Sequence, residues 1–446
     1  MLSIRFIREN ADVVKKSLKQ RKDIEKINWV DEVLAIDEKW LSLKQEVDEL
    51  RRRRNEIAQE INSLKKEGKD TSKKIKEAKD VPGKIKTSEE ELEKLEEKRK
   101  YFLMRIPNVL HESVPYGKDD SENVEVKKVG KMPKFSFELK AHGELVEGLG
   151  IADFKRATKI AGSGFNYLKG ELVLLDIALQ RFAIDFLVKK GYTLVYPPFM
   201  MNRKSCEGVT DLADFENVMY KVEDEDLYMI ATSEHPMGAM FMDEVIDEKD
   251  LPLKFCGLSA CFRKEIGSHG VDTRGLFRMH QFNKVEQFIF CKPEDSWKLH
   301  EELQKNSEVM FKELGIPFRV VNICTGDIGI VAAKKFDIEA WFPRSKEYKE
   351  VGSNSNCTSY QAIRLNIRYD KKDGERNYVH TLNNTGIATS RVMVAILENY
   401  QQKDGSVKIP KVLQKYMYSK KFIGKPEKKT KKTYKKKKLS KKRKKR

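Results

Sequence analysis

Charged and aromatic side chains suited to phosphate chemistry concentrate in one stretch of the sequence. Arg263, Lys264 and Glu265 lie at its start, and residues 278–288 follow after a polar loop. A guanidinium can donate paired hydrogen bonds to a phosphate, and a carboxylate can accept from an ammonium group. The pattern from residue 255 to residue 290 predicts two β-strands joined by a long loop.

Alternation along these strands predicts which side chains share a face. Consecutive side chains of an extended strand point to opposite sides, so Arg263 and Glu265 should point together. The same rule groups five side chains of the second strand: His280, Phe282, Lys284, Glu286 and Phe288. At about 3.3 Å per residue, Phe282 and Glu286 would lie about 13 Å apart, close to the length of a nucleotide joined to an amino acid.

A long helix and a short strand are predicted upstream of this stretch. Apolar residues recur at helical spacing over residues 167–190. Residues 192–196 then form a predicted strand that stops at Pro197, which is typical of a sheet edge. Residues 107–150 are rich in proline, glycine and acids, and they are predicted to lead into this second domain.

The first third of the chain predicts an antiparallel helical hairpin. The apolar stripes step by three and four along Val33, Ile36, Trp40, Leu43, Val47, Leu50, Ile57, Ile61 and Leu64, with Arg54 in the seam, and along Ile85, Leu92, Leu95, Phe102 and Ile106, with Ser88 and Arg99. Gly68 suits the end of the first helix, and Asp70 or Thr71 the start of the next. Pro82 predicts a short helix before it and a main helix starting near it. Such an arm could reach a partner, or it could be a dimerisation coiled coil or solvated helices.

Composition restricts partners and location. The formal net charge is +19, and residues 425–446 alone hold fifteen Lys or Arg and one acid, a local +14 that leaves +5 elsewhere. This basic tail is predicted to be disordered and to tether RNA, or else to act as a solubilising or localisation tail. The sequence has no apolar run of about 20 residues, so we expect no membrane association and a cytoplasmic protein. Six scattered cysteines predict buried, reduced thiols, and Cys256 and Cys261 lack the partners of a zinc site.

Several runs together resemble class II aminoacyl-tRNA synthetases, in the archaeal and eukaryotic-like seryl form with an N-terminal arm. Residues 262–265, Arg278 and residues 280–288 look like motif 2, Pro197 is similar to the end of motif 1, and residues 383–391 with the helical 392–400 resemble motif 3. Further seryl hallmarks are Ala231–Glu234, Asp337–Pro343 and Glu350–Cys357. The resemblance covers about residues 1 to 417, and it favours a tRNA-binding role for the arm.

The resemblance implies roles for individual residues. The catalytic set would be Arg263 on the α-phosphate, Glu265, Arg278 and Arg391, the last on the γ-phosphate. The ATP site would comprise Arg263, Lys264, Glu265, Met279, Phe282, Glu350, Val351, Gly352, Ser353 and Arg391, with Glu350 and Ser353 also binding Mg²⁺. The serine site would comprise Thr232, Ser233, Glu234, Arg263, Glu286, Asn383 and Thr385.

Two departures from the family pattern concern the serine pocket. Many relatives have Gly and Ser where Asn384 and Thr385 stand, and Gly where Ser390 stands. The volume of the pocket is therefore in question, whereas the hydroxyl at residue 385 is kept.

The predicted fold class is α+β: a helical hairpin followed by a class II catalytic domain on a mixed, mainly antiparallel β-sheet flanked by helices. The expected divisions are an N-terminal tRNA-binding domain (1–110), a linker with connecting strands (111–150), a catalytic domain (151–418) and a disordered basic tail (419–446).

The implied function is ATP-dependent activation of L-serine and its transfer to the 3′ end of tRNA(Ser), with tRNA(Sec) as a further candidate, by a homodimer. ATP and Mg²⁺ are the expected cofactors, and no zinc is expected. Two alternatives remain: a class II paralogue that activates a small amino acid for another acceptor, and a noncatalytic RNA-binding paralogue. The arm argues against the first, and Arg263, Glu286 and Arg391 argue against the second.

Overall fold

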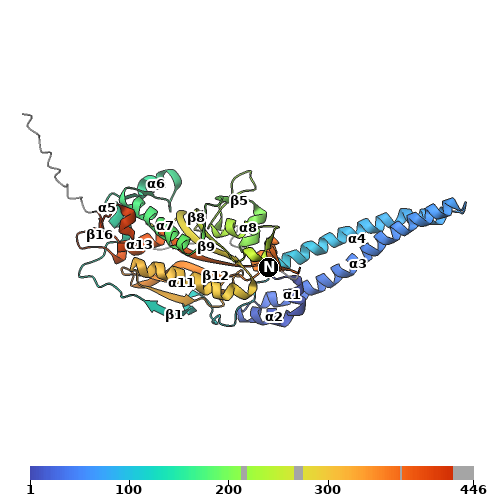
Figure 1. The fold of residues 1–446 in the computed structure, drawn as a ribbon, viewed down its shortest axis with the longest axis horizontal. Helices are drawn as coiled ribbons and strands as arrows, with labels where there is room; N and C mark the ends of the chain where they lie inside the picture. The colour runs from blue at the N-terminus through green and yellow to red at the C-terminus, as the bar shows by residue number, and fades with distance from the viewer. Residues whose placement is uncertain (212–217, 266–274, 372–373, 425–446) are drawn as a thin grey trace, which may run out of the picture.

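The computed structural model describes residues 1–211, 218–265, 275–371 and 374–424 of the 446-residue chain (Figure 1). Most of the predicted polar loop between residues 265 and 278, and the basic residues from 425 onward, lie outside the described part.

Two long antiparallel helices form an arm that projects from the rest of the molecule (Figure 1). The arm consists of α3 (Ile24–Lys66) and α4 (Ser72–Arg105), and α1 (Ile4–Glu9) and α2 (Ala11–Gln20) pack at its base. The 43 residues of α3 would span about 65 Å at the usual helical rise. Gly68, with φ +69°, follows the end of α3, as the sequence predicts. The hairpin prediction is therefore confirmed.

The predicted break at Pro82 is wrong, because α4 runs through this residue without interruption. Proline removes one backbone hydrogen bond from a helix interior. Its neighbours Val81 and Ile85, however, are buried against Ile57 of α3. Packing across the hairpin therefore holds the helix together where the local sequence would end it.

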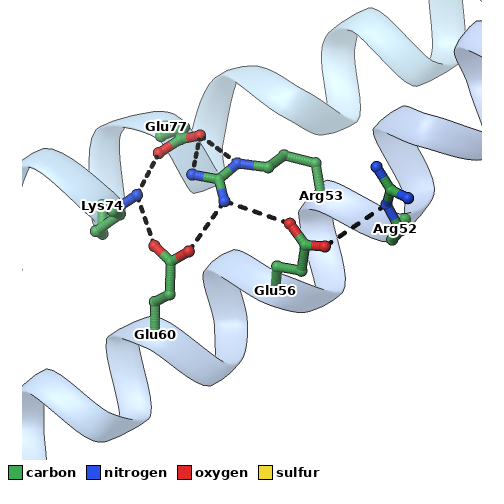
Figure 2. A network of polar contacts seen from close by, with 6 residues as sticks. All are labelled: Arg52, Arg53, Glu56, Glu60, Lys74 and Glu77. Atoms are coloured by element: carbon green, nitrogen blue, oxygen red, sulfur yellow. Dashed lines mark hydrogen bonds and ion pairs between the residues drawn. The ribbon is translucent and has the colours of Figure 1, made fainter.

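The seam position predicted for Arg54 is occupied by Arg53, while Arg54 is exposed. Figure 2 shows the Arg53 guanidinium between Glu77 of α4, at 2.8 Å, and Glu60 of α3, at 2.9 Å. Lys74 pairs with the same two carboxylates at 2.6 and 3.1 Å. Arg53 rather than Arg54 therefore points toward the other helix, because Glu60 and Glu77 lie next to it.

A buried carboxylate near the base of the arm was not predicted. Asp37, only 1% exposed, pairs with Arg8 at 2.5 Å and with Arg99 at 2.8 Å. Arg99 also lies over the Trp40 ring, with its guanidinium carbon 4.1 Å from the ring centroid. The interface between the helices is therefore polar next to Ile36. Asp37 needs its arginine partners there, because a buried charge without a partner is costly.

An eight-stranded sheet forms the centre of the second domain, in the order β1-β10-β11-β12-β15-β9-β8-β4. All neighbours are antiparallel except β4 and β8, which are parallel. The strands are β1 (Val124–Val129), β4 (Thr193–Val195), β8 (Leu253–Phe262), β9 (Gln281–Cys291), β10 (Phe318–Asn322), β11 (Lys334–Phe342), β12 (Glu347–Asn356) and β15 (His380–Ala388). The predicted antiparallel pair between residues 255 and 290 and the predicted edge strand before Pro197 are both present.

Three helices pack into the main apolar core on one side of this sheet: α7 (Glu171–Lys189), α11 (Ser296–Leu314) and α13 (Thr389–Asn399). The predicted start of α7 at residue 167 is wrong. Tyr167 and Leu168 form the short strand β3, and Gly170 adopts φ +52°, so the helix begins at Glu171. The apolar spacing alone did not reveal this turn.

Smaller elements border the sheet. They are α5 (His142–Gly148), β2 (Ala152–Asp153), α6 (Phe154–Ala161), β3 (Tyr167–Leu168), β5 (Met200–Met201), α8 (Arg203–Val209), β6 (Tyr228–Met229), α10 (Glu234–Gly238), β7 (Val245–Asp247), α12 (Tyr360–Leu365), β13 (Arg368–Asp370), β14 (Arg376–Tyr378), β16 (Val407–Lys408) and β17 (Phe422–Ile423). No helix in the described ranges is long and apolar enough to cross a bilayer.

The segment predicted to be a linker with connecting strands contains β1, which is the edge strand of the large sheet. The tail expected to be disordered from residue 419 remains in the fold as far as residue 424, because β17 pairs with β16 and Lys420 contacts Glu171 at 3.0 Å. All six cysteines are buried free thiols, as predicted.

Candidate active site

Two adjoining cavities lie against the sheet. The larger cavity has a volume of about 460 Å³ and the smaller about 40 Å³. Their shared walls are Arg263, Lys284, Glu350 and Thr385. Other polar groups of the larger cavity include Thr232, Glu234, His235, Glu286, Lys335, Ser353 and Asn383. The smaller cavity is completed by Glu265, Phe277, Met279, Phe282, Val351, Gly352, Ala388, Ser390 and Arg391.

Strand β9 supplies one row of these side chains. Phe282 lines the smaller cavity, Lys284 lines both, and Glu286 lines the larger one, so the predicted shared face exists along this part of the strand. The ends of the predicted row have other surroundings. His280 stacks on Phe165, with ring centroids 5.1 Å apart, and Phe288 is fully buried in an apolar cluster.

Arg263 stands where the two cavities meet. Its guanidinium carbon lies 5.3 Å from the centroid of the Phe282 ring, and its Nε donates to the Ala231 carbonyl oxygen at 3.3 Å. The prediction that Arg263 and Glu265 share a strand face is wrong, because β8 ends at Phe262 and Glu265 has φ +49°. Both side chains nevertheless line the smaller cavity, since the chain turns after the strand.

Two carboxylates face the larger cavity: Glu286 is buried and Glu234 is half-buried. Glu286, 1% exposed, pairs with Lys284 at 2.6 Å. Glu234 accepts from the Asn383 amide at 3.0 Å and from Gln361 at 3.4 Å. Burial, together with the nearby charge of Glu286, raises the pKa of Glu234 to about 7. Burial also raises the pKa of Glu286, against the opposing effect of Lys284. This wall is suited to a cationic group.

Glu350 carries a stable negative charge beside three cations. Desolvation at the cavity wall opposes the charge of Glu350, whose side chain is 46% exposed, but Arg391, Lys335 and Arg263 outweigh it and hold the pKa of Glu350 at about 2. Arg391 contacts Glu350 at 3.2 Å, and its guanidinium carbon lies 5.3 Å from the Phe277 ring centroid. A carboxylate and two arginines thus surround the passage between the cavities.

Sequence reasoning assigned no role to three polar residues at this site. Lys335 lines the larger cavity, and Asp337, two residues further along β11, is buried with its pKa raised to about 7, mainly by burial. Gln361 joins Glu234 to Thr381, whose hydroxyl donates to Gln361 at 2.7 Å. The alternation of Lys335 with Asp337 along a strand could have indicated a shared face, whereas nothing local pointed to Gln361.

Three predicted site residues do not line either cavity. Ser233 is fully buried, and its hydroxyl donates to the Gly257 carbonyl oxygen at 3.4 Å. Lys264 is half-buried, and its backbone N–H donates to the Val218 carbonyl oxygen at 2.9 Å. Arg278 is largely exposed and lies 3.9 Å from Glu265. The remaining predicted site residues line one or both cavities.

The three residues that depart from the family pattern, Asn384, Thr385 and Ser390, lie in different environments. Thr385 lines both cavities and Ser390 the smaller one. Asn384 faces away from both, toward α11, where its amide donates to the Leu303 carbonyl oxygen at 2.6 Å. Only residues 385 and 390 therefore contribute surface to the cavities.

Comparisons with known proteins agree over nearly the whole chain. Residues 1–110 match the model of the seryl-tRNA synthetase N-terminal domain, and residues 220–400 match the class II tRNA synthetase core domain of the G, H, P, S and T enzymes. A serine–tRNA ligase from Methanocella arvoryzae is 62% identical, covering 95% of this chain and 100% of that protein.

Solved structures are similar as well. The seryl-tRNA synthetase from Pyrococcus horikoshii, crystallised with ATP, is 50% identical with a TM-score of 0.89, covering 95% of this chain and 99% of that one. The cytoplasmic serine–tRNA ligase from Naegleria fowleri, in complex with AMP, is 37% identical with a TM-score of 0.85, over 95% and 98% of the two chains.

Proposed function

This chain belongs to the seryl-tRNA synthetase family and is a class II serine–tRNA ligase, and from this premise we propose how its two cavities divide the reaction. The observation that carries the proposal is the position of Arg263, which lines both cavities, with Phe282 beside it in the smaller one and Glu286 in the larger one.

The larger cavity binds L-serine. Glu234 and Glu286 hold its ammonium group, because a half-buried and a buried carboxylate offer the opposite charge in a site that is partly shielded from water. Thr232, Asn383 and Thr385 surround the hydroxyl end. A buried hydroxyl partner disfavours alanine, which would leave that partner without a hydrogen bond.

The residues that line the smaller cavity bind the adenosine end of ATP. Phe282 stacks on the base, and Glu265, Met279, Val351 and Gly352 line the same space. Arg263 binds the α-phosphate at the junction, and Arg391 binds the γ-phosphate. Arg278 at the rim, Lys264 and Ser233 act from outside the cavity walls.

The reaction then needs no protein nucleophile. A serine carboxylate oxygen attacks the α-phosphorus, and the bond to the bridging oxygen breaks to release pyrophosphate. A ribose hydroxyl at the tRNA 3′ end next attacks the seryl carbonyl carbon and releases AMP. The chain's residues act by holding the reacting groups in line and stabilising the charge that develops on phosphate.

Glu350 and Ser353 would hold Mg²⁺ together with the ATP phosphates. Both offer oxygen ligands at the larger cavity, and the low pKa of Glu350 keeps its carboxylate charged. Mg²⁺ commonly uses one or two carboxylates plus substrate phosphates, so this small donor set fits. The ion supplies neutralisation of phosphate charge when bound.

Serine affinity should depend on pH through Glu234. Because its pKa is raised to about 7, this carboxylate gains a proton as the pH falls through neutrality and then attracts the ammonium group less well. We expect kcat/KM for serine to fall by up to about tenfold per pH unit below 7, with KM for ATP nearly constant. Pyrophosphate exchange from pH 5.5 to 8.5 measures this.

The matched variants are Glu234→Gln, which should have low activity without this pH dependence, and the exposed Glu301→Gln, which should keep it. A serine KM that stays constant from pH 6 to 8 in the unmodified protein would contradict the assignment.

The arm binds tRNA(Ser) through its backbone and shape, with tRNA(Sec) as a second candidate acceptor. We expect deletion of residues 48–91, rejoined by a short turn, to leave pyrophosphate exchange within about twofold and to raise KM for tRNA at least about tenfold. This cut keeps the Asp37–Arg99 ion pair and the apolar base of the arm. Equal losses in exchange and in charging would show that the arm is not dedicated to tRNA.

The protein acts as a homodimer through the α7 and β4 edge. Large apolar side chains are exposed there, Ile177 and Val188 on α7 and Leu194 on β4, next to Tyr196 at 72% exposure. β4 ends the strand order of the sheet, so its outer edge is available for pairing. The six free thiols are consistent with a reducing, cytoplasmic location.

A further inference from the structure

We propose that Ser307, on α11 behind the sheet, is a positioning residue that holds Thr385 in the serine cavity and thereby sets the preference for serine over alanine. The inference rests on the proposed role of the larger cavity. Ser307 itself touches neither cavity, so its effect would be transmitted through the backbone of β15.

The Ser307 hydroxyl joins three groups at the centre of the fold. It is 1% exposed and donates to the Thr385 carbonyl oxygen at 2.9 Å. It accepts from the side-chain amides of Asn384, at 2.9 Å, and Gln287, at 3.1 Å. A hydroxyl has one donor and two acceptor positions, so all of its capacity is used.

The hydrogen bond from Ser307 matters for Thr385 because the pairing of β15 with β9 becomes irregular directly after this residue. Thr385 pairs with Glu286 and Ile387 with Val285, so Gly386 is an extra residue in the ladder. A Cβ at residue 386 would lie 2.9 Å from the Val285 carbonyl oxygen, a contact only glycine avoids. Bulges of this kind interrupt the hydrogen-bond ladder and re-aim side chains.

The bulge determines which residues face the cavities. Beyond it, Ile387 packs in the core on the helix side, and Ala388 lines the smaller cavity. Regular alternation would have placed residue 387 on the same face as Thr385. The hydrogen bond from Ser307 therefore holds the strand at the residue where its alternation changes.

The same cluster reaches the neighbouring strand β9. Gln287, which follows Glu286 on β9, also accepts from the Asn306 amide at 3.0 Å. Glu286 and Thr385 are cross-strand partners. The Ser307 hydroxyl on α11 is therefore hydrogen-bonded to both strands at this pair, to β15 through Thr385 and to β9 through Gln287. Asn384 adds a second tie to the helix through the Leu303 carbonyl oxygen.

Specificity should follow from this rigidity. A correctly placed hydrogen-bond partner for the hydroxyl increases the affinity for serine. It does not increase the affinity for alanine, which has no hydroxyl. A loosened Thr385 would therefore weaken serine binding more than alanine binding. The expected change is in KM for serine and in the ratio of the two amino acids, since chemistry at the α-phosphate is left in place.

The experiment compares Ser307→Ala with the unmodified full-length protein in pyrophosphate exchange with serine and with alanine. We expect KM for serine to rise about tenfold, kcat and KM for ATP to stay within about twofold, and the serine-to-alanine ratio of kcat/KM to fall about tenfold. Ser307→Thr retains a hydroxyl and should restore most of the ratio. Asn384→Ala should shift the ratio in the same direction, by less.

Ser296→Ala is the matched control. Ser296 is on the same helix and fully buried, and its hydroxyl donates to the Pro293 carbonyl oxygen at 3.0 Å. It also contacts His380 Nδ1, at the far end of β15, at 3.0 Å, and neither residue lines a cavity. Thermal melting of both alanine variants measures the general cost of a lost buried hydroxyl. If Ser296→Ala lowers the ratio as much as Ser307→Ala does, the effect is unspecific and the proposal is overturned.

Thr385→Val separates the inference from the proposed function. If Thr385→Val lowers the ratio while Ser307→Ala leaves it unchanged, the cavity has its proposed role and the positioning role of Ser307 is wrong. If neither variant changes the ratio, the assignment of Thr385 to the serine hydroxyl fails, and the inference fails with it.

Discussion

Replacing Arg263 by alanine should lower serine-dependent pyrophosphate exchange about a thousandfold, mainly through kcat. Arg263 is the arginine that lines both cavities, where the carboxylate of serine and the α-phosphate of ATP must meet. The nearby cations already have partners, since Arg391 contacts Glu350 and Lys284 contacts Glu286. Neither can supply a second planar fork at the α-phosphate.

Two further variants sharpen this test. Arg263→Lys keeps the charge without the paired donors, so it should recover at most about tenfold of the loss. Arg319→Ala, which breaks ion pairs with Glu339 and Glu125 in the same sheet, should leave exchange near normal. Near-normal exchange by a folded Arg263→Ala protein would remove this residue from the reaction.

Replacing Glu286 by glutamine should raise KM for serine about a hundredfold, with a much smaller change in KM for ATP. Glutamine has nearly the same shape but no charge, so the ammonium group loses one of its two carboxylates. Lys284, which is 5% exposed, would at the same time lose the partner that lies 2.6 Å away.

The control for Glu286→Gln is Glu339→Gln on β11. Glu339 is also a largely buried sheet carboxylate, paired with Arg319 at 2.5 Å, but it lines neither cavity. Its replacement should change thermal stability without changing KM for serine. An unchanged serine KM in Glu286→Gln would mean that the larger cavity does not bind the ammonium group where we place it.

Local sequence patterns were sufficient to predict much of the secondary structure. The apolar stripes predicted the hairpin, and period-two alternation predicted the β8–β9 pair and the shared face of Phe282, Lys284 and Glu286. These features follow from the repeat distances of helix and strand, which every residue of an element shares. The resemblance to the family then attached functions to the residues, although their individual roles remain predictions.

Other features depended on contacts between distant segments. Pro82 stays helical because α3 packs against its neighbours, and Arg53 rather than Arg54 turns inward because Glu77 lies opposite. Glu265 reaches the smaller cavity only because the chain leaves β8 with a positive φ.

The sequence by itself determined the helical hairpin, the β8–β9 pair and the face of β9 that lines the cavities, because these follow from short-range periodicity. Only the tertiary structure decided which charges meet, as at Asp37 and Glu350, and how α11 is tied to the bulge beside Thr385. Pairing and desolvation of a charge depend on groups that are far away in the chain, so no local window contains them.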